Sequence, residues 1–160
     1  MISLFRRLFA GAEPMIAQAR PRDAAPLAAL HAAAFRRGWT EDEFERLLLE
    51  SNVLAHRATV SGRLVGFIVS RIAAGEAEIL SVAVTAARRG RGLAGRLLDL
   101  HLRRLAGLGV DVVFLEVDDD NVPARRLYAR ARFREVGRRE GYYARPQGAA
   151  IALVLRRELA

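Results

Sequence analysis

Short β-type runs and amphipathic helical stretches alternate along this chain, and their order limits the folds open to it. Asp23 is expected to cap a first helix, and a T-x-x-E capping box at Thr40 and Glu43 opens a second. Ser61-Gly62 joins two β runs as a hairpin turn does. The predicted strands cover residues 15–19, 53–60, 63–72, 78–84, 110–117, 133–139 and 149–155, and the further helices cover residues 92–108 and 121–131. The order β-α-α-β-β-β-α-β-α-β-β predicts an α/β fold with one mixed sheet between helices.

Two of the strand runs, residues 78–84 and 110–117, are apolar enough to be central in the sheet. The helix between them has its leucines broadly on one side, at Leu93, Leu97, Leu100 and Leu105. We expect that side to be buried against the sheet.

The composition fits a globular chain of ordinary size. Its 160 residues suffice for one core, and 52% apolar with 28% charged residues exclude wholesale disorder, a collagen-like structure and several membrane spans. The absence of cysteine excludes a disulfide framework, a thiolate nucleophile and a finger-type zinc site, and the absence of lysine excludes a lysine Schiff base. We expect residues 15–160 to form a single domain, residues 1–14 to be an N-terminal extension, and the protein to be cytoplasmic without a membrane partner.

A net charge of +8 favours an anionic partner, such as nucleic acid, a ribosome or a phosphorylated cofactor. The basic, glycine-rich segment from Arg88 to Gly95 precedes a long helix, where free backbone N–H groups suit a pyrophosphate. The other interpretation is a tight turn with solvated arginines. Residues 90–95 also match the dinucleotide-binding string G-x-G-x-x-G. The acidic residue expected about 20 positions later is only Asp111, at the wrong end of a strand, so we reject that interpretation.

The same segment carries a family resemblance. Arg89-x-x-Gly92-x-Ala94 is similar to the acetyl-CoA signature R/Q-x-x-G-x-G/A of the GCN5-related N-acetyltransferases, the GNAT family, and the order of elements over residues 15–158 resembles that fold. Within the family, the chain resembles the RimI type, which acetylates the N-terminal alanine of a small-subunit ribosomal protein. The pieces that carry this likeness, in order, are Trp39-Thr40, Leu115-Glu116-Val117, Asn121, Leu127-Tyr128, Phe133 and Tyr142-Tyr143.

The resemblance implies the GNAT fold, with a mixed, mostly antiparallel sheet, and acetyl-CoA as cosubstrate without a metal. It implies that the backbone of Val82, Ala83 and Val84 pairs with the pantetheine arm, and that Asn121 touches the cofactor. Amides that hold the pyrophosphate would be those of Arg89, Gly90, Arg91, Gly92, Leu93, Ala94 and Gly95. In this family the acetyl group passes directly from thioester to amine, which agrees with the absence of cysteine.

Glu116 is the predicted general base. It interrupts an apolar strand and, by period-two alternation, shares a face with Val112 and Phe114. A carboxylate on a largely apolar face is costly unless it is paired or functional. The alternative is a glutamate at the exposed end of the strand, paired with an arginine. The resemblance favours the catalytic role.

Tyr128 is the predicted acid that protonates the leaving thiolate. It lies seven residues after Asn121, two helical turns, so both side chains project from nearly the same side. A tyrosine at helical spacing also fits plain core packing, and the role comes from the resemblance. Asn121 is expected to cap this helix as well.

The substrate is predicted to be a protein N-terminus. An α-amino group, with a pKa of about 8, offers roughly a few hundredfold more free base at neutral pH than a lysine side chain with a pKa of about 10.4. Trp39, Tyr142 and Tyr143 resemble the family's substrate-side aromatics, although packing near a loop also explains them. The alternatives are an acetyltransferase for lysine side chains or small-molecule amines, a non-catalytic acyl-CoA sensor, and a basic nucleic-acid-binding module, although we expect no stable nucleic-acid partner.

Two positions depart from the family pattern. Arg132 stands where RimI-like proteins usually have glycine, so we expect strain in a turn that prefers positive φ. An acidic residue common before the last strand is replaced by Ala149 or Ala150, which leaves the peptide preference open. The run of aspartates at residues 118–120 fits a solvated helix-capping loop. The three histidines have no metal-ligand spacing and receive no predicted chemistry: His31, His56 and His101.

Overall fold

The computed structural model describes residues 11–145 and 148–159 and shows one mixed sheet packed between helices. The strand order is β1-β2-β3-β4-β5-β7-β6, and every neighbouring pair is antiparallel except β4 and β5. The strands are β1 (Met15–Gln18), β2 (Val53–Val60), β3 (Arg63–Ala73), β4 (Glu76–Val84), β5 (Val112–Asp118), β6 (Arg134–Arg145) and β7 (Gly148–Glu158). The helices are α2 (Ala24–Ala34), α3 (Glu41–Leu49), α4 (Leu93–Gly107) and α5 (Val122–Arg130), with 3₁₀ turns at Pro21–Asp23 and Ala86–Arg88. The predicted fold and the predicted order of elements are confirmed.

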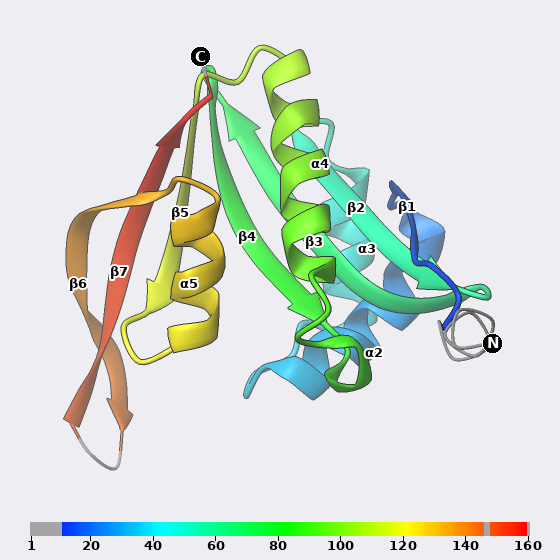
Figure 1. Ribbon diagram of the computed structural model, residues 1–160, viewed down its shortest axis with the longest axis horizontal. Helices are drawn as coiled ribbons and strands as arrows, with labels where there is room; N and C mark the ends of the chain where they lie inside the picture. Colours follow the sequence, from blue (N-terminus) through cyan, green and yellow to red (C-terminus); the bar gives the residue numbers. More distant parts are fainter. Residues whose placement is uncertain (1–10, 146–147, 160) are drawn as a thin grey trace, which may run out of the picture.

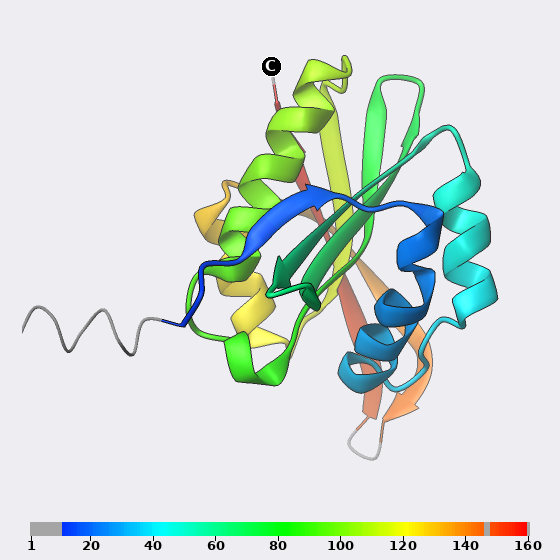
Figure 2. The ribbon, with the colours of Figure 1, turned by 90° about the vertical axis from the view of Figure 1, so that its right-hand side faces the viewer.

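The helices form a layer on each side of the sheet. α4 and α5 lie in front of it in Figure 1, and α2 and α3 lie behind; Figure 2 shows the same layers from the side. We call the two sides the α4 face and the α2 face. Leu97 and Leu105 of α4 are fully buried on the first, and Phe44 and Phe67 on the second. Each such side chain stabilises the fold by roughly 2 kcal/mol through its removal from water.

The predicted capping box of α3 is confirmed. The Thr40 N–H donates to Glu43 Oε2 at 2.7 Å, and the Glu43 N–H donates to Thr40 Oγ1 at 3.2 Å. Both backbone groups would otherwise lack a partner at the helix start. The hydrogen bond from the Thr40 N–H lowers the pKa of Glu43.

Two local expectations are wrong. Asp23 stands at the N-cap position of α2, but its side chain makes no cap hydrogen bond; its carboxylate accepts from the Arg20 N–H at 2.8 Å and lies 3.2 Å from Arg57, because a 3₁₀ turn starts before the helix. Leu100 is 37% exposed. The buried arc of α4 is instead centred on residues 97, 101 and 105, with Leu98 and Leu102 beside it.

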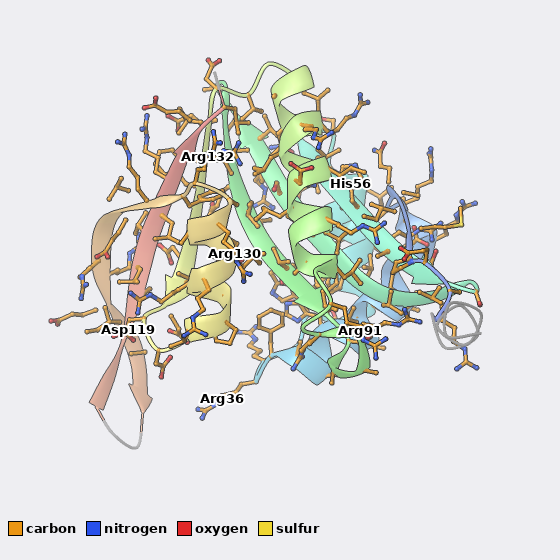
Figure 3. The ribbon with its side chains drawn as sticks, in the orientation of Figure 1. Arg36, His56, Arg91, Asp119, Arg130 and Arg132 are labelled. Atoms are coloured by element: carbon orange, nitrogen blue, oxygen red, sulfur yellow. The ribbon has the colours of Figure 1, made fainter. Side chains whose placement is uncertain are left out.

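The end of α5 fixes the position of a predicted site residue. The Arg132 N–H donates to the Ala129 carbonyl and the Phe133 N–H to the Tyr128 carbonyl, each at 3.0 Å, which is a Schellman motif. The Phe133 ring packs edge-on against Tyr128, with 5.8 Å between centroids. Arg132, labelled in Figure 3, has a φ of 66°, as the sequence predicts. A non-glycine residue there costs about 1 kcal/mol.

β4 contains a β-bulge halfway along its length. Val69 of β3 pairs with Ser81 and Ser70 pairs with Ile79, so Leu80 is the extra residue of a β-bulge. The parallel pairing of β4 with β5 ends at the same level, at Ile79 and Leu115. Beyond that level the two strands separate toward the lower end of the molecule (Figure 1).

Candidate acetyl-transfer site

The residues predicted to bind the pantetheine arm lie where β4 and β5 separate. Val82, Ala83 and Val84 pair with β3 along one edge of β4. Along the other edge, the described residues show no strand pairing beyond Ile79. A free strand edge presents N–H and C=O groups to an extended ligand. The predicted pantetheine-binding stretch therefore has an open edge.

The loop after β4 leads into a helix start without a side-chain cap. Gly92 is the N-cap of α4, with a φ of 79° and no cap hydrogen bond, whereas Thr40 caps α3 and Asn121 caps α5. The N–H groups of the first turn, residues 93–95, are therefore free for an anion, and the helix dipole favours one there. A Cβ built on Gly92 meets no heavy atom within 4 Å, so the space beside these donors is open.

Arginines around the loop have different partners. Arg89 Nε donates to the Val84 carbonyl at 3.0 Å and ties the loop to the end of β4. Arg88 and Arg96 contact the segment before β1, through the Ala12 carbonyl and Glu13. Arg91 makes no ion pair with a described residue and projects near the start of α4 (Figure 3). This donor set fits the diphosphate of acetyl-CoA.

The N–H groups of residues 93–95 and the side chain of Arg91 together form what we call the acetyl-CoA cradle. Gly92→Ala tests this assignment. Alanine at a φ of 79° is strained, and its methyl group would occupy the space that a diphosphate needs. We expect the KM for acetyl-CoA to rise at least about tenfold, which corresponds to about 1.4 kcal/mol. Gly109→Ala is the matched control, because Gly109 has a φ of 86°, equally open surroundings and a position beyond the other end of α4. Equal KM values in both variants would contradict the assignment.

Glu116 lies on the α2 face of β5 with Phe114, as period-two alternation predicts. Both side chains line a groove of about 350 Å³ together with Glu78 and Val154. Glu116 is 40% exposed, and its Oε1 lies 3.3 Å from Arg139 Nη1. The arginine-paired alternative is thus present in the free protein, and the carboxylate remains accessible from the groove.

Tyr128 lies on the α4 face of the sheet. It is 8% exposed and packs in the same core as Leu115 and Val117 of β5. Burial raises the pKa of Tyr128 to about 12, so the phenol keeps its proton at neutral pH. No described residue accepts a hydrogen bond from its hydroxyl. A protonated phenol therefore stands on the opposite face of β5 from the Glu116 carboxylate.

Asn121 caps α5, as predicted, since its Oδ1 accepts from the Ala124 N–H at 3.3 Å. The loop that contains Asn121 shares the lower end of the molecule with two others. Figure 3 places Asp119 after β5, Arg91 before α4 and Arg36 after α2 at that end. Trp39 belongs to the third loop, so it stands at the same end. The side chains of Tyr142 and Tyr143 lie outside the described residues, although their backbone belongs to β6.

Two residues near the site were missed by sequence reasoning. Arg139 of β6 reaches Glu116 across β7, where its strand partner is the small Ala152. His31 accepts a hydrogen bond at Nδ1 from the Trp39 N–H at 3.0 Å. The first contact depends on the register of three strands. The position of His31 could have been recognised from its spacing, because His31 and Phe35 are four residues apart and so lie on one helix face.

A sequence model described as the Acetyltransferase (GNAT) family matches residues 24–133. The chain belongs to the GNAT family. The matched range includes the free edge of β4, the glycine-rich loop, Glu116 and Tyr128.

Relatives of this GNAT protein differ in their substrates. A mycothiol acetyltransferase of Clavibacter michiganensis subsp. michiganensis is 36% identical over 122 residues, which cover 71% of this chain and 40% of that protein. The chain thus spans about two fifths of the length of that relative. A [ribosomal protein bS18]-alanine N-acetyltransferase of Escherichia coli (strain K12) is 28% identical over 117 residues, which cover 73% of this chain and 78% of that protein.

Solved structures agree with the GNAT fold. The ribosomal-protein-S18-alanine N-acetyltransferase from Escherichia coli superposes with a TM-score of 0.85 at 24% identity, covering 92% of this chain and 95% of that one. Ard1 from Thermoplasma volcanium superposes with a TM-score of 0.79 at 26% identity, covering 92% of this chain and 98% of that one.

Two features are absent from residues 11–145 and 148–159. No helix in those ranges combines the length and apolar character needed to cross a bilayer. No three acidic, histidine or cysteine side chains there are grouped so as to hold a metal ion.

Proposed function

We propose that this GNAT enzyme transfers acetyl from acetyl-CoA to a protein N-terminal α-amine, with the N-terminal alanine of a small-subunit ribosomal protein as the first candidate. The observation that carries the proposal is the position of Glu116 and Tyr128 on opposite faces of β5, beside the opening between β4 and β5. An acceptor that enters from the groove on the α2 face meets the carboxylate first. The named bS18-alanine acetyltransferases among the relatives support the same substrate class.

Acetyl-CoA supplies an activated acyl group when bound. The first-turn N–H groups of α4 and Arg91 would hold its diphosphate, and the free edge of β4 would hold its pantetheine arm. Glu116 accepts the proton that the amine loses as the N–C bond forms. Tyr128 gives its phenol proton to the sulfur as the C–S bond breaks. The N–C bond thus replaces the C–S bond without an acyl-enzyme, and the return of one proton from Glu116 to Tyr128 through solvent restores both groups.

A small-molecule amine is the second candidate substrate. It is favoured by the mycothiol acetyltransferases, which are more similar in sequence to this chain than the bS18-alanine acetyltransferases are. The groove beside Glu116 is open, so the size of the acceptor is not restricted by a closed cavity.

Mass spectrometry of acetyl-CoA reactions tests the proposal. The acceptors are an alanine-starting peptide that also contains a lysine, the same peptide with a blocked α-amine, peptides with other first residues, and a small primary amine. We expect acetylation of the free α-amine only, located by fragmentation, and a preference for alanine. Acetylation of the blocked peptide on its lysine, or of the small amine alone, would contradict the α-amine assignment.

A further inference from the structure

His31 occupies the centre of an aromatic stack at the end of α2. Its side chain is 4% exposed, and its ring lies 4.4 Å from the Phe35 ring and 4.5 Å from the Trp39 ring, measured between centroids. The interplanar angles are 29° and 16°, so the imidazole is stacked between both rings. Phe35 itself is 40% exposed. The loop from α2 to α3 thus folds back over the histidine.

A hydrogen bond also joins His31 to the α2–α3 loop. The Trp39 backbone N–H donates to His31 Nδ1 at 3.0 Å. That nitrogen must therefore carry a lone pair, which fixes the ring as the neutral tautomer with its proton on Nε2. A proton on Nδ1 would replace the acceptor with a second donor and break the contact.

The stack is joined to the open stretch of β4. His31 packs edge-on to Phe44 of α3, at 5.6 Å, and lies 6.1 Å from Phe67 of β3. Phe67 pairs with Ala83, in the part of β4 whose other edge is free. Trp39 packs in the same cluster as Leu80, the bulge residue of β4. The loop is therefore fixed with respect to the site by contacts that all pass through one core.

We propose that His31 is a positioning residue for the acceptor side of the site: its neutral ring holds Trp39 and the α2–α3 loop in place. The proposal rests on the proposed function, because it assigns the loop to acceptor binding. His31 acts only through Trp39 and takes no part in proton transfer. Loss of the acceptor nitrogen releases the loop without altering the acetyl-CoA cradle.

The charges around His31 favour the neutral ring. Burial lowers the pKa of His31, and the Glu43 carboxylate of α3 opposes this effect. α2 contains no other titratable side chain, and β3 presents Phe67 to the ring. The adjoining loop contributes Arg36 and Arg37, and Arg71 of β3 is paired with Glu50. Protonation is thus expected below the ordinary histidine range, on the acid side of about pH 6.5.

Trp39 is the single tryptophan of the chain, so tryptophan fluorescence reports on the surroundings of this ring, which include His31. A protonated imidazole quenches a stacked indole. We expect a fluorescence step on acidification of the wild-type protein, below about pH 6.5, while far-ultraviolet circular dichroism stays constant. His31→Phe keeps a stacking ring without an acceptor, and His31→Asn keeps an acceptor without a ring; both should lose the step. A step that survives in His31→Phe would overturn the proposal.

Steady-state kinetics separates the two roles of the ring. We expect His31→Phe to raise the KM for the α-amine about fivefold, as for one lost hydrogen bond, with the KM for acetyl-CoA unchanged within about twofold. His31→Asn should restore the acceptor KM to within about twofold of wild type. Equal KM values for the amine in wild type and His31→Phe would overturn the positioning role. Absence of α-amine turnover in the wild type, with the fluorescence step present, would overturn the proposed function while supporting the control of Trp39 by His31.

Discussion

Glu116→Gln is expected to lower kcat for α-amine acetylation about a hundredfold, with the KM for acetyl-CoA unchanged within about twofold. Glutamine keeps the size of the side chain and most of its hydrogen bonding, but it cannot accept the proton that the amine loses. The residue lies on the opposite face of β5 from Tyr128 and away from the acetyl-CoA cradle, so cofactor binding should be insensitive to it. Initial rates at saturating acetyl-CoA, over a range of peptide concentrations, give both constants.

Glu158→Gln is the matched control. Glu158 of β7 also forms ion pairs with arginines of β7 and β6, at 2.6 Å from Arg156 and 3.6 Å from Arg134. It lies beside Val112, at the other end of β5 from Glu116. Both substitutions remove only exposed ion pairs, which contribute little to stability. If Glu116→Gln retained kcat within about threefold of the control, Glu116 would not be the general base.

Local signals were sufficient for the elements of this fold. Thr40 and Glu43 predict the start of a helix because their hydrogen bonds involve residues only three positions apart. Ser61 and Gly62 predict a hairpin turn. In the structure both have a positive φ, 50° and 77°. The glycine-rich loop is predictable for the same reason, because glycine favours the left-handed conformation that Gly92 takes. Each of these features depends on a short stretch of chain.

The candidate site was only partly predictable, because some of its contacts cross several strands. Arg139 reaches Glu116 only because β6, β7 and β5 pair in one particular register, with Ala152 between them. The bulge at Leu80, which coincides with the end of the β4–β5 pairing, leaves no clear mark in an apolar run. The prediction for Leu100 is wrong for a related reason. The centre of the buried arc of α4 is a histidine, which a pattern of leucines does not reveal.

That histidine, His101, belongs to a buried chain of three polar side chains on the α4 face. Its Nδ1 lies 2.8 Å from Nδ1 of His56 on β2, and its Nε2 lies 2.7 Å from the Ser70 hydroxyl on β3. Figure 3 labels His56 at this position beside α4. One Nδ1 must donate and the other accept, so the chain is complete when both rings are neutral. Two protonated rings would place donor against donor.

Acid should therefore destabilise the folded protein through its histidines. Burial, with Arg104 nearby, lowers the pKa of His56 to about 4, and burial, with His56 nearby, lowers the pKa of His101 to about 3. In the unfolded chain both titrate at about 6.5. As the pH falls from about 6.5 toward 4, the unfolded chain binds protons that the folded chain does not. The stabilisation is fully present above about pH 6.5 and is lost as the pH falls through this window.

We expect the free energy of unfolding to fall by about 2 to 3 kcal/mol between about pH 7.5 and about pH 5.5, measured by urea denaturation. The expected decrease depends little on the folded-state pKa values of the two histidines, because both lie below the range from about pH 7.5 to about pH 5.5. Glu43 and Glu158, whose pKa values are lowered, stay ionised throughout it. These two carboxylates therefore add little to the change.

A variant with His56→Leu, His101→Leu and Ser70→Ala removes all three polar partners together, so none is left buried without a hydrogen bond. It should lose most of the pH dependence over this window, whatever its stability at neutral pH. The chain has only three histidines, so His31→Phe, which leaves the pair intact, is the matched control and should retain most of the dependence. The same slope in the triple variant and the control would show that other groups bind the protons. A slope confined to the control would assign the acid sensitivity of the fold to the contact between β2 and α4.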